Sequence, residues 1–182
     1  MKKENIPNIL TIIRFILIPF IYISVLSKHF LTALIIFTIS AFTDVLDGYI
    51  VRKYNYITDI GKLIDPLADK LTQISLLLSL AILRILDWWI FAIVFVKELV
   101  LVISASVLYS KKDVVVYSKW YGKLATTLFY LAIVCSLLIN QFNIIMPFRV
   151  DLYLYYLAIL ATVFALIMYA IKFEFKRNKT NS

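Results

Sequence analysis

Four aspartates, Asp44, Asp47, Asp65 and Asp69, lie close together in a chain that is otherwise rich in apolar residues. The first two are three residues apart and the last two are four apart, so each pair shares one face if its segment is helical. Carboxylates at close range repel one another, and some become protonated, unless a cation joins them. A ligand set made only of oxygen atoms is typical of a hard ion such as Mg²⁺ or Mn²⁺, and four carboxylates suit two such ions. The spacing therefore predicts a divalent-metal site.

Small and basic residues stand among these aspartates. Two of the chain's three glycines, Gly48 and Gly61, fall inside the stretch, together with Arg52. Gly48 exposes backbone and allows close approach by a ligand or a helix, and Gly61 does the same or relaxes the turn before the second pair. An isolated aspartate at a segment end is usually a cap, which accounts for Asp59, Asp87, Asp113 and Asp151. That interpretation does not account for four aspartates at helical spacing, so they are predicted to be functional.

The composition assigns the chain to the membrane. Of its 182 residues 63% are hydrophobic, and the mean hydropathy is +0.91. A soluble domain cannot keep that much apolar surface out of water, so we expect an all-α integral membrane protein with residues 1–182 in a single domain. Six apolar segments are near the ~20 residues that cross a bilayer as a helix. They are residues 8–27, 30–51, 63–86, 88–109, 120–139 and 153–173.

The basic residues predict the orientation. Twelve of them lie before the first segment, between the second and third, between the fourth and fifth, or at the end of the sixth and after it, whereas only Lys28, Arg84 and Arg149 lie between the others. The positive-inside rule then puts both termini in the cytoplasm, and the aspartates at the cytoplasmic ends of the second and third segments. We therefore expect a multi-pass protein of the cell membrane with its active site on the cytoplasmic side.

Counts of particular residues exclude several classes of site. The net charge of +8 indicates attraction to anionic lipid, and since the basic residues form no tract, no nucleic-acid partner is expected. His29 is the only histidine, which excludes a histidine-based metal site or a Ser-His triad. Cys135 is the only cysteine, so no internal disulfide can form and a small core residue is expected.

Because of Pro66, the sequence allows two different starting points for the third helix. If the helix begins there, Asp65 is an N-cap and Pro66 is the first helical residue. If it begins near residues 58–59, Asp65 and Asp69 lie one to three turns inside the helix, and the proline is tolerated within the membrane.

Residues 44–69 resemble the motif of the CDP-alcohol phosphotransferase family, D-x-x-D-G-x-x-A-R, a variable gap, and G-x-x-x-D-x-x-x-D. Seven of the eight defining positions match, and the exception is Val51, where the family usually has alanine. Compared with alanine, valine adds methyl groups, which would narrow the nucleotide pocket of such an enzyme but would not remove any metal or substrate ligand. The resemblance covers the whole chain and is strong from about residue 5 to residue 70.

This resemblance implies a six-helix membrane enzyme, usually a homodimer, that transfers a substituted phosphate from a CDP-linked donor to an alcohol and releases CMP. The four aspartates would hold Mg²⁺ or Mn²⁺, with Asp69 both a ligand and the general base. Gly48 and Gly61 would let the nucleotide press against backbone, and Arg52 would pair with a phosphate through its planar fork.

The start of the chain adds to the resemblance. Asn8, Thr11 and Arg14 recur every three residues. The pattern N-x-x-T-x-x-R is similar to the first helix of the bacterial phosphatidylglycerophosphate synthases of this family, which join glycerol 3-phosphate to CDP-diacylglycerol. By that resemblance Asn8 and Thr11 would bind the donor and Arg14 the acceptor phosphate. The alternative is that Asn8 caps the helix and Arg14 extends to the membrane surface.

The acceptor is predicted from residues farther along the chain. Gly122, Lys123 and Thr126 match the G-K-x-K-T pattern of those synthases, and Lys123 and Lys62 are predicted to bind the acceptor phosphate with Arg14. Ala125 replaces a lysine, and this form also resembles cardiolipin synthases of the same fold, which use phosphatidylglycerol. Glycerol 3-phosphate remains the favoured acceptor.

Lys97 and Glu98 lie within the fourth segment and are predicted to form a self-contained intramembrane pair.

An alternative from another class is a divalent-cation transporter, because acidic clusters in membranes often mark ion paths. Such a path needs polar groups through the whole membrane. Here the acids gather on one side and residues 30–43 are nearly all apolar, so the sequence favours the enzyme.

Overall fold

The structure is a computed structural model that describes residues 6–54, 59–110, 120–145 and 147–180. The side chains of residues 6–8, 52, 59–63, 101–110, 121 and 169–180 are outside the described part. None of the described residues lies in a strand, and the described part of the chain forms six helices. They are α1 Ile6–Leu26, α2 Phe30–Tyr54, α3 Asp59–Ile82, α4 Trp88–Ser110, α5 Trp120–Gln141 and α6 Val150–Thr180.

The six predicted helices are present, and several are longer than the apolar segments that indicated them. Helix α2 continues to Tyr54 and α6 to Thr180, past the predicted ends at residues 51 and 173. Hydropathy marks only the part of a helix that suits hydrocarbon. Backbone hydrogen bonding continues beyond that part into polar sequence, so the predicted ends fall short.

Helices α1, α3 and α5 end in the same way. Lys28, Arg84 and Asn143 follow these helices with φ of 60°, 57° and 47°, the left-handed conformation that closes a helix. In each case the amide of the next residue donates to the carbonyl five residues earlier. The third segment was predicted to reach residue 86, and this helix stop is the reason that α3 ends at Ile82.

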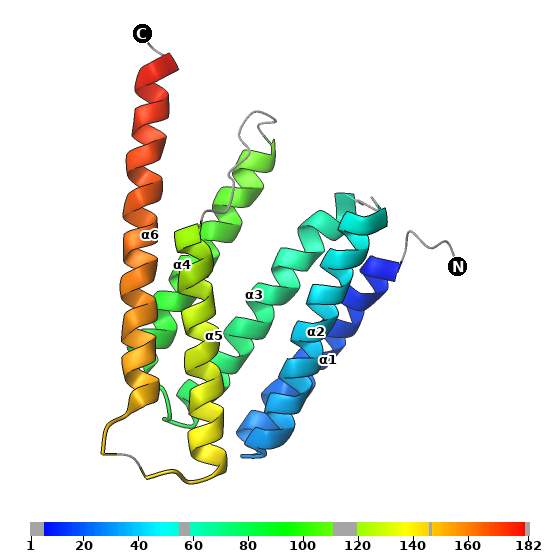
Figure 1. Ribbon diagram of the computed structural model, residues 1–182, viewed down its shortest axis with the longest axis vertical. Helices are drawn as coiled ribbons and strands as arrows, with labels where there is room; N and C mark the ends of the chain where they lie inside the picture. Colours follow the sequence, from blue (N-terminus) through cyan, green and yellow to red (C-terminus); the bar gives the residue numbers. More distant parts are fainter. Residues whose placement is uncertain (1–5, 55–58, 111–119, 146, 181–182) are drawn as a thin grey trace.

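The helices run alternately in opposite directions, so both chain ends lie toward the end of the bundle where α2 meets α3 (Figure 1). Helix α1 packs against α2 and α3, and α5 packs against α6. The contacts of α2 and α3 with α5 join these two groups, and α4 packs against α3. Leucines of α3, such as Leu76 and Leu80, are fully buried with Ile21 of α1 and Ile133 of α5.

Four helices among the described residues are long and apolar enough to cross a membrane. These spans are Ile9–Leu26, Phe30–Val51, Gly122–Gln141 and Val150–Met168. Many large apolar side chains face outward, including Phe20, Phe42 and Leu160, where a soluble protein would place polar ones. The chain is therefore a multi-pass membrane protein. Helix α3 is not among the four, and it carries Asp65, Asp69 and Lys70 in its first half.

A polar clamp holds the opposite end of the bundle. Arg149 donates to the carbonyl of Ile85 over 2.7 Å and to Asp151 over 3.1 Å, and Asp151 also accepts from Ser136. The hydrogen bond to Asp151 raises the pKa of the Arg149 guanidinium. Asp151 does lie in the first turn of α6, as expected for a cap, but it is almost fully buried and joins three segments.

Candidate active site

A buried arginine gathers three of the four aspartates. Arg14 of α1 is 2% exposed, and its two terminal nitrogens donate to Asp44 and Asp47 of α2. Its Nη2 atom also lies 3.5 Å from Oδ1 of Asp65 on α3. A metal site made by all four aspartates requires the second and third helices to converge. In the structure α2 and α3 do so around Arg14, a cation that the first helix supplies.

Thr11 lies one turn before Arg14 on the same face of α1. Its hydroxyl donates to Oδ1 of Asp65, so α1 contacts this carboxylate through two side chains. Both residues were predicted to belong to the site, but as ligands for substrate. The alternative in which Arg14 extends to the membrane surface is wrong, because its side chain is buried among carboxylates that attract the guanidinium inward.

The exposure of the aspartates shows where a ligand can enter. Asp47 is only 5% exposed, whereas Asp44 is 50% exposed and Asp65 31% exposed. The guanidinium carries one positive charge against three carboxylates, which leaves two negative charges when all three are ionised. A divalent cation would cancel that excess, and oxygen ligands suit Mg²⁺ or Mn²⁺.

The carboxylates meet at Arg14 and not at a common point. Among the described residues no group of three or more acidic, histidine or cysteine side chains is arranged to hold an ion as it stands. The donor set therefore fits a divalent ion by chemistry and charge, and binding requires the carboxylates to rearrange around it.

Asp69 lies one turn deeper on α3 than Asp65 and has a different partner. The hydroxyl of Tyr130, on α5, donates to Oδ1 of Asp69. This contact holds the carboxylate at the junction of α3 and α5. No sequence motif indicated it, because a single tyrosine in an apolar helix carries no signal. Asp69 is thus near the Arg14 cluster but is held separately from it.

The structure shows that the third helix begins before Pro66. Helix α3 begins at Asp59, so Asp65 and Asp69 are inside the helix and Asp65 is not an N-cap. Gly61 was expected to precede the third segment and instead lies in the first turn of α3. Gly48 lies within α2 directly after Asp47, as predicted, and is partly buried.

Other predicted residues contribute less to the observed geometry. Lys123 is exposed in the first turn of α5, and none of the described ion pairs joins it to the aspartates. The side chains of Asn8, Arg52 and Lys62 fall outside the described residues, and the surroundings of Gly61 are not described, so the predicted roles of all four stay predictions.

Glu98 is shared by two lysines. Its carboxylate pairs with Lys97, as predicted, and also lies 2.9 Å from Nζ of Lys70 on α3. Glu98 is 1% exposed, and the ammonium of Lys97 lies 5.3 Å from the centre of the Phe129 ring. The prediction of a self-contained pair missed Lys70, which links α4 to the helix that carries Asp65 and Asp69.

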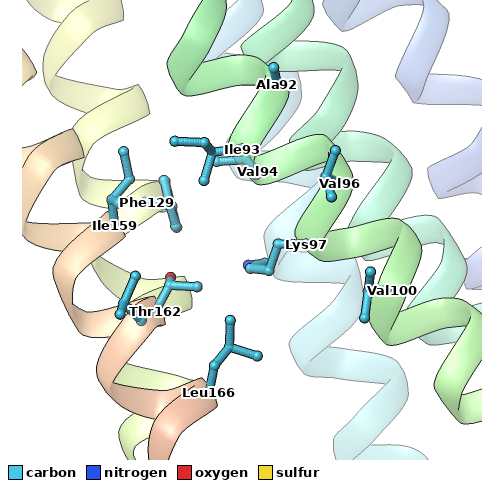
Figure 2. Close-up of a pocket in the computed structure, with 11 residues that line it drawn as sticks. Ala92, Ile93, Val94, Val96, Lys97, Val100, Phe129, Ile159, Thr162 and Leu166 are labelled. Atoms are coloured by element: carbon cyan, nitrogen blue, oxygen red, sulfur yellow. The ribbon is translucent and has the colours of Figure 1, made fainter.

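Lys97 also reaches an apolar cavity between α4 and α6. The cavity is about 430 Å³, and apolar residues of both helices line it, with Phe129 of α5 behind them (Figure 2). Lys97 and Thr162 are its polar lining residues, and Thr162 already donates to the carbonyl of Ala158. The cavity therefore suits an apolar group in contact with a cation.

We expect Glu98→Gln to lower the free energy of unfolding by about 3–5 kcal/mol, because the nearly buried ammonium of Lys97 and the partly buried ammonium of Lys70 would lose their shared counterion. The measurement is thermal unfolding in detergent. Adding Lys97→Met removes one of the two cations and should recover part of the loss. A Glu98→Gln protein as stable as the wild type would show that the carboxylate does not stabilise the helix contact.

Comparisons with known proteins agree with this site. The family model described as CDP-alcohol phosphatidyltransferase matches residues 4–168. The CDP-diacylglycerol–glycerol-3-phosphate 3-phosphatidyltransferase of Haemophilus influenzae is 35% identical over 176 residues, which are 92% of each chain. The protein of that name from Aquifex aeolicus is 33% identical over 142 residues, 77% of this chain and 79% of its own.

A further relative is the probable phosphatidylglycerophosphate synthase of Mycobacterium tuberculosis, which is 32% identical over 132 residues, 69% of this chain and 62% of its own. The family match extends through Arg14 and all four aspartates, and through five complete helices before it ends within the sixth. It therefore favours the enzyme over the transporter. The chain belongs to the CDP-alcohol phosphatidyltransferase family.

Proposed function

We propose that the protein transfers the phosphatidyl group of CDP-diacylglycerol to glycerol 3-phosphate, giving phosphatidylglycerophosphate and CMP. The observation that carries the proposal is the meeting of Asp44, Asp47 and Asp65 at Arg14, with Asp69 one turn deeper. The relatives named for this reaction, which are similar over most of the chain, support the choice of donor and acceptor.

The family generally uses divalent metal ions. We propose that Asp44, Asp47, Asp65 and Asp69 hold two ions, Mg²⁺ or Mn²⁺. When bound, these ions would neutralise the donor pyrophosphate and polarise the phosphorus under attack. The excess negative charge around Arg14 supports this assignment, because it gives the site an affinity for cations.

Asp69 is the proposed general base. Tyr130 donates to Oδ1 of Asp69, which limits rotation of the carboxylate and leaves Oδ2 for the acceptor. Asp69 would take the proton of an acceptor hydroxyl within hydrogen-bond reach. The hydroxyl oxygen then bonds to the phosphorus that carries the diacylglycerol, and the bond from that phosphorus to the bridging oxygen breaks. CMP leaves with the bonding electrons.

The substrates would contact residues on both sides of the aspartates. For the donor we propose Asn8 and Thr11 of α1 with Gly48, Arg52 and Gly61. For the acceptor phosphate we propose Arg14, Lys62 and Lys123. Arg14 would then exchange part of its contact with the aspartates for the phosphate when the metal ions compensate the carboxylates.

We propose that all six helices cross the cell membrane, that both termini are cytoplasmic, and that residues 1–182 form one catalytic domain. The alternating helix directions support this topology, because they bring the start of α1, the end of α2, the start of α3 and the end of α6 toward one end of the bundle (Figure 1). The excess of basic residues at that end supports a cytoplasmic active site. We further propose a homodimer, by analogy with the family.

Product analysis tests the function. Purified protein is given CDP-diacylglycerol and Mg²⁺ or Mn²⁺, and in parallel glycerol 3-phosphate, phosphatidylglycerol, inositol phosphate or serine. We expect CMP and phosphatidylglycerophosphate by mass spectrometry with the first acceptor, and neither product when a chelator removes the metal. Cardiolipin formed from phosphatidylglycerol, with no reaction of glycerol 3-phosphate, would overturn the assigned acceptor.

A further inference from the structure

Gln73 is a polar residue that the proposed reaction does not yet use. It lies on α3, is 0% exposed, and neither its amide oxygen nor its amide nitrogen has a hydrogen-bond partner in the part of the chain that the structure describes. Its neighbour Thr72 is also buried but donates to the carbonyl of Ala68 over 2.8 Å. The lack of a partner is therefore specific to Gln73 and is not general to polar residues of this helix.

The register of α3 places this amide next to the reacting groups. Asp65, Asp69 and Gln73 follow one another at four-residue intervals, so all three lie on one face of the helix. Side chains on a helix lean toward its N-terminus, and the amide of Gln73 thus covers the turn that carries Asp69. From α5, the hydroxyl of Tyr130 reaches the same carboxylate.

A buried amide without a partner is costly, since it loses its hydrogen bonds to water and gains none from the protein. Such groups are rare in native structures, and they persist where a ligand completes them. A hydrocarbon side chain of similar size would fill the same space at no such cost. A glutamine in this enclosed place, one turn from the proposed base, points to a ligand with a group that both donates and accepts hydrogen bonds.

We propose that Gln73 binds the acceptor hydroxyl that does not react, and so selects a vicinal diol phosphate. The inference rests on the proposed function. Glycerol 3-phosphate has a primary hydroxyl that attacks and a secondary hydroxyl on the adjacent carbon. With the first at Asp69, the second lies within the span of one helical turn, where the amide can donate to it and accept from it. To reach the acceptor, the Gln73 amide rotates out of the buried position that it has in the structure.

The experiment compares glycerol 3-phosphate with 3-hydroxypropyl phosphate, which keeps the phosphate and the primary hydroxyl but lacks the secondary one. The wild type should prefer glycerol 3-phosphate by roughly tenfold or more in kcat/KM, because a site built to bind a hydroxyl rejects an analogue without it. In Gln73→Leu and Gln73→Met the preference should fall to within about twofold. The ratio is taken within one preparation, so a loss of folded enzyme cancels.

Thr72→Val is the matched control, since it removes a buried polar group that already has its partner, and it should keep the wild-type preference. A second readout is ligand-dependent stability: glycerol 3-phosphate should raise the unfolding temperature of the wild type more than that of Gln73→Leu. An unchanged preference in both Gln73 variants overturns the inference and leaves the proposed function intact. If the wild type forms no product with glycerol 3-phosphate, both the inference about Gln73 and the proposed function are overturned.

Discussion

Replacing Asp69 with asparagine should reduce turnover by at least about a thousandfold, because a neutral amide cannot take the proton of the acceptor hydroxyl. The protein should remain folded. Asparagine has almost the shape of aspartate, and its side-chain oxygen can still accept the hydrogen bond from Tyr130. The measurement is the rate of CMP release from CDP-diacylglycerol in detergent micelles, together with thermal unfolding of the same preparation.

The matched control is Asp87→Asn. Asp87 is exposed directly before α4, at the opposite end of the bundle from Asp69, and the substitution makes the same chemical change outside the site. Its turnover should stay within about twofold of the wild type, because the position is exposed and distant from the site, and asparagine caps a helix about as well as aspartate does. If Asp69→Asn kept more than a tenth of the wild-type rate, another group would have to be the base.

Elements that depend on local pattern were predicted from the sequence. Apolar length located all six helices, and helical spacing put Asp44 with Asp47 and Asp65 with Asp69 on shared faces. Helix ends were less accurate, because they depend on backbone stops. The left-handed residue after α3 is Arg84, and arginine is not among the residues that favour that conformation.

Contacts between helices that are distant in sequence were not predicted. Arg14 was identified as a site residue, but its place among three aspartates depends on how α1 packs against α2 and α3. Tyr130 lies 61 residues from its partner Asp69, and Lys70 joins Glu98 from another helix. No short motif carries such information.

Buried polar groups show the same limit. In sequence, Gln73 is one of several polar residues in a mostly apolar segment, with Thr72 before it and Ser75 shortly after it. Nothing distinguishes it from a residue at the membrane surface. Only the packing of α3 shows that its amide is enclosed and without a partner. The site is therefore predictable where residues are neighbours on one helix, and requires the structure where several helices contribute.

Arg14→Met should destabilise the protein by about 3–5 kcal/mol, because it leaves three neighbouring carboxylates without their buried counterion. For a chain of this size the loss corresponds to a fall in unfolding temperature of roughly 6–20 °C. Methionine fills much of the space of the arginine stem, so the effect comes mainly from charge. Thermal unfolding in a metal-free buffer measures it.

Two further variants separate charge from shape. Arg14→Lys keeps the positive charge but loses the planar fork that contacts Asp44 and Asp47 together, so its stability should be intermediate. The double variant Arg14→Met with Asp47→Asn removes one charge of each sign and should be more stable than Arg14→Met alone. Together with the single variant Asp47→Asn, it completes a double-mutant cycle that measures the coupling between the two residues.

Added Mg²⁺ should raise the unfolding temperature of Arg14→Met more than that of the wild type. In the variant no guanidinium competes for Asp44, Asp47 and Asp65. An ion that binds only the folded protein stabilises it more when it binds more tightly. The comparison thereby links the arginine to the metal site without any measurement of activity. Equal shifts in the two proteins would mean that Arg14 and the ion do not share these carboxylates, and the proposed metal ligands would then have to be sought elsewhere.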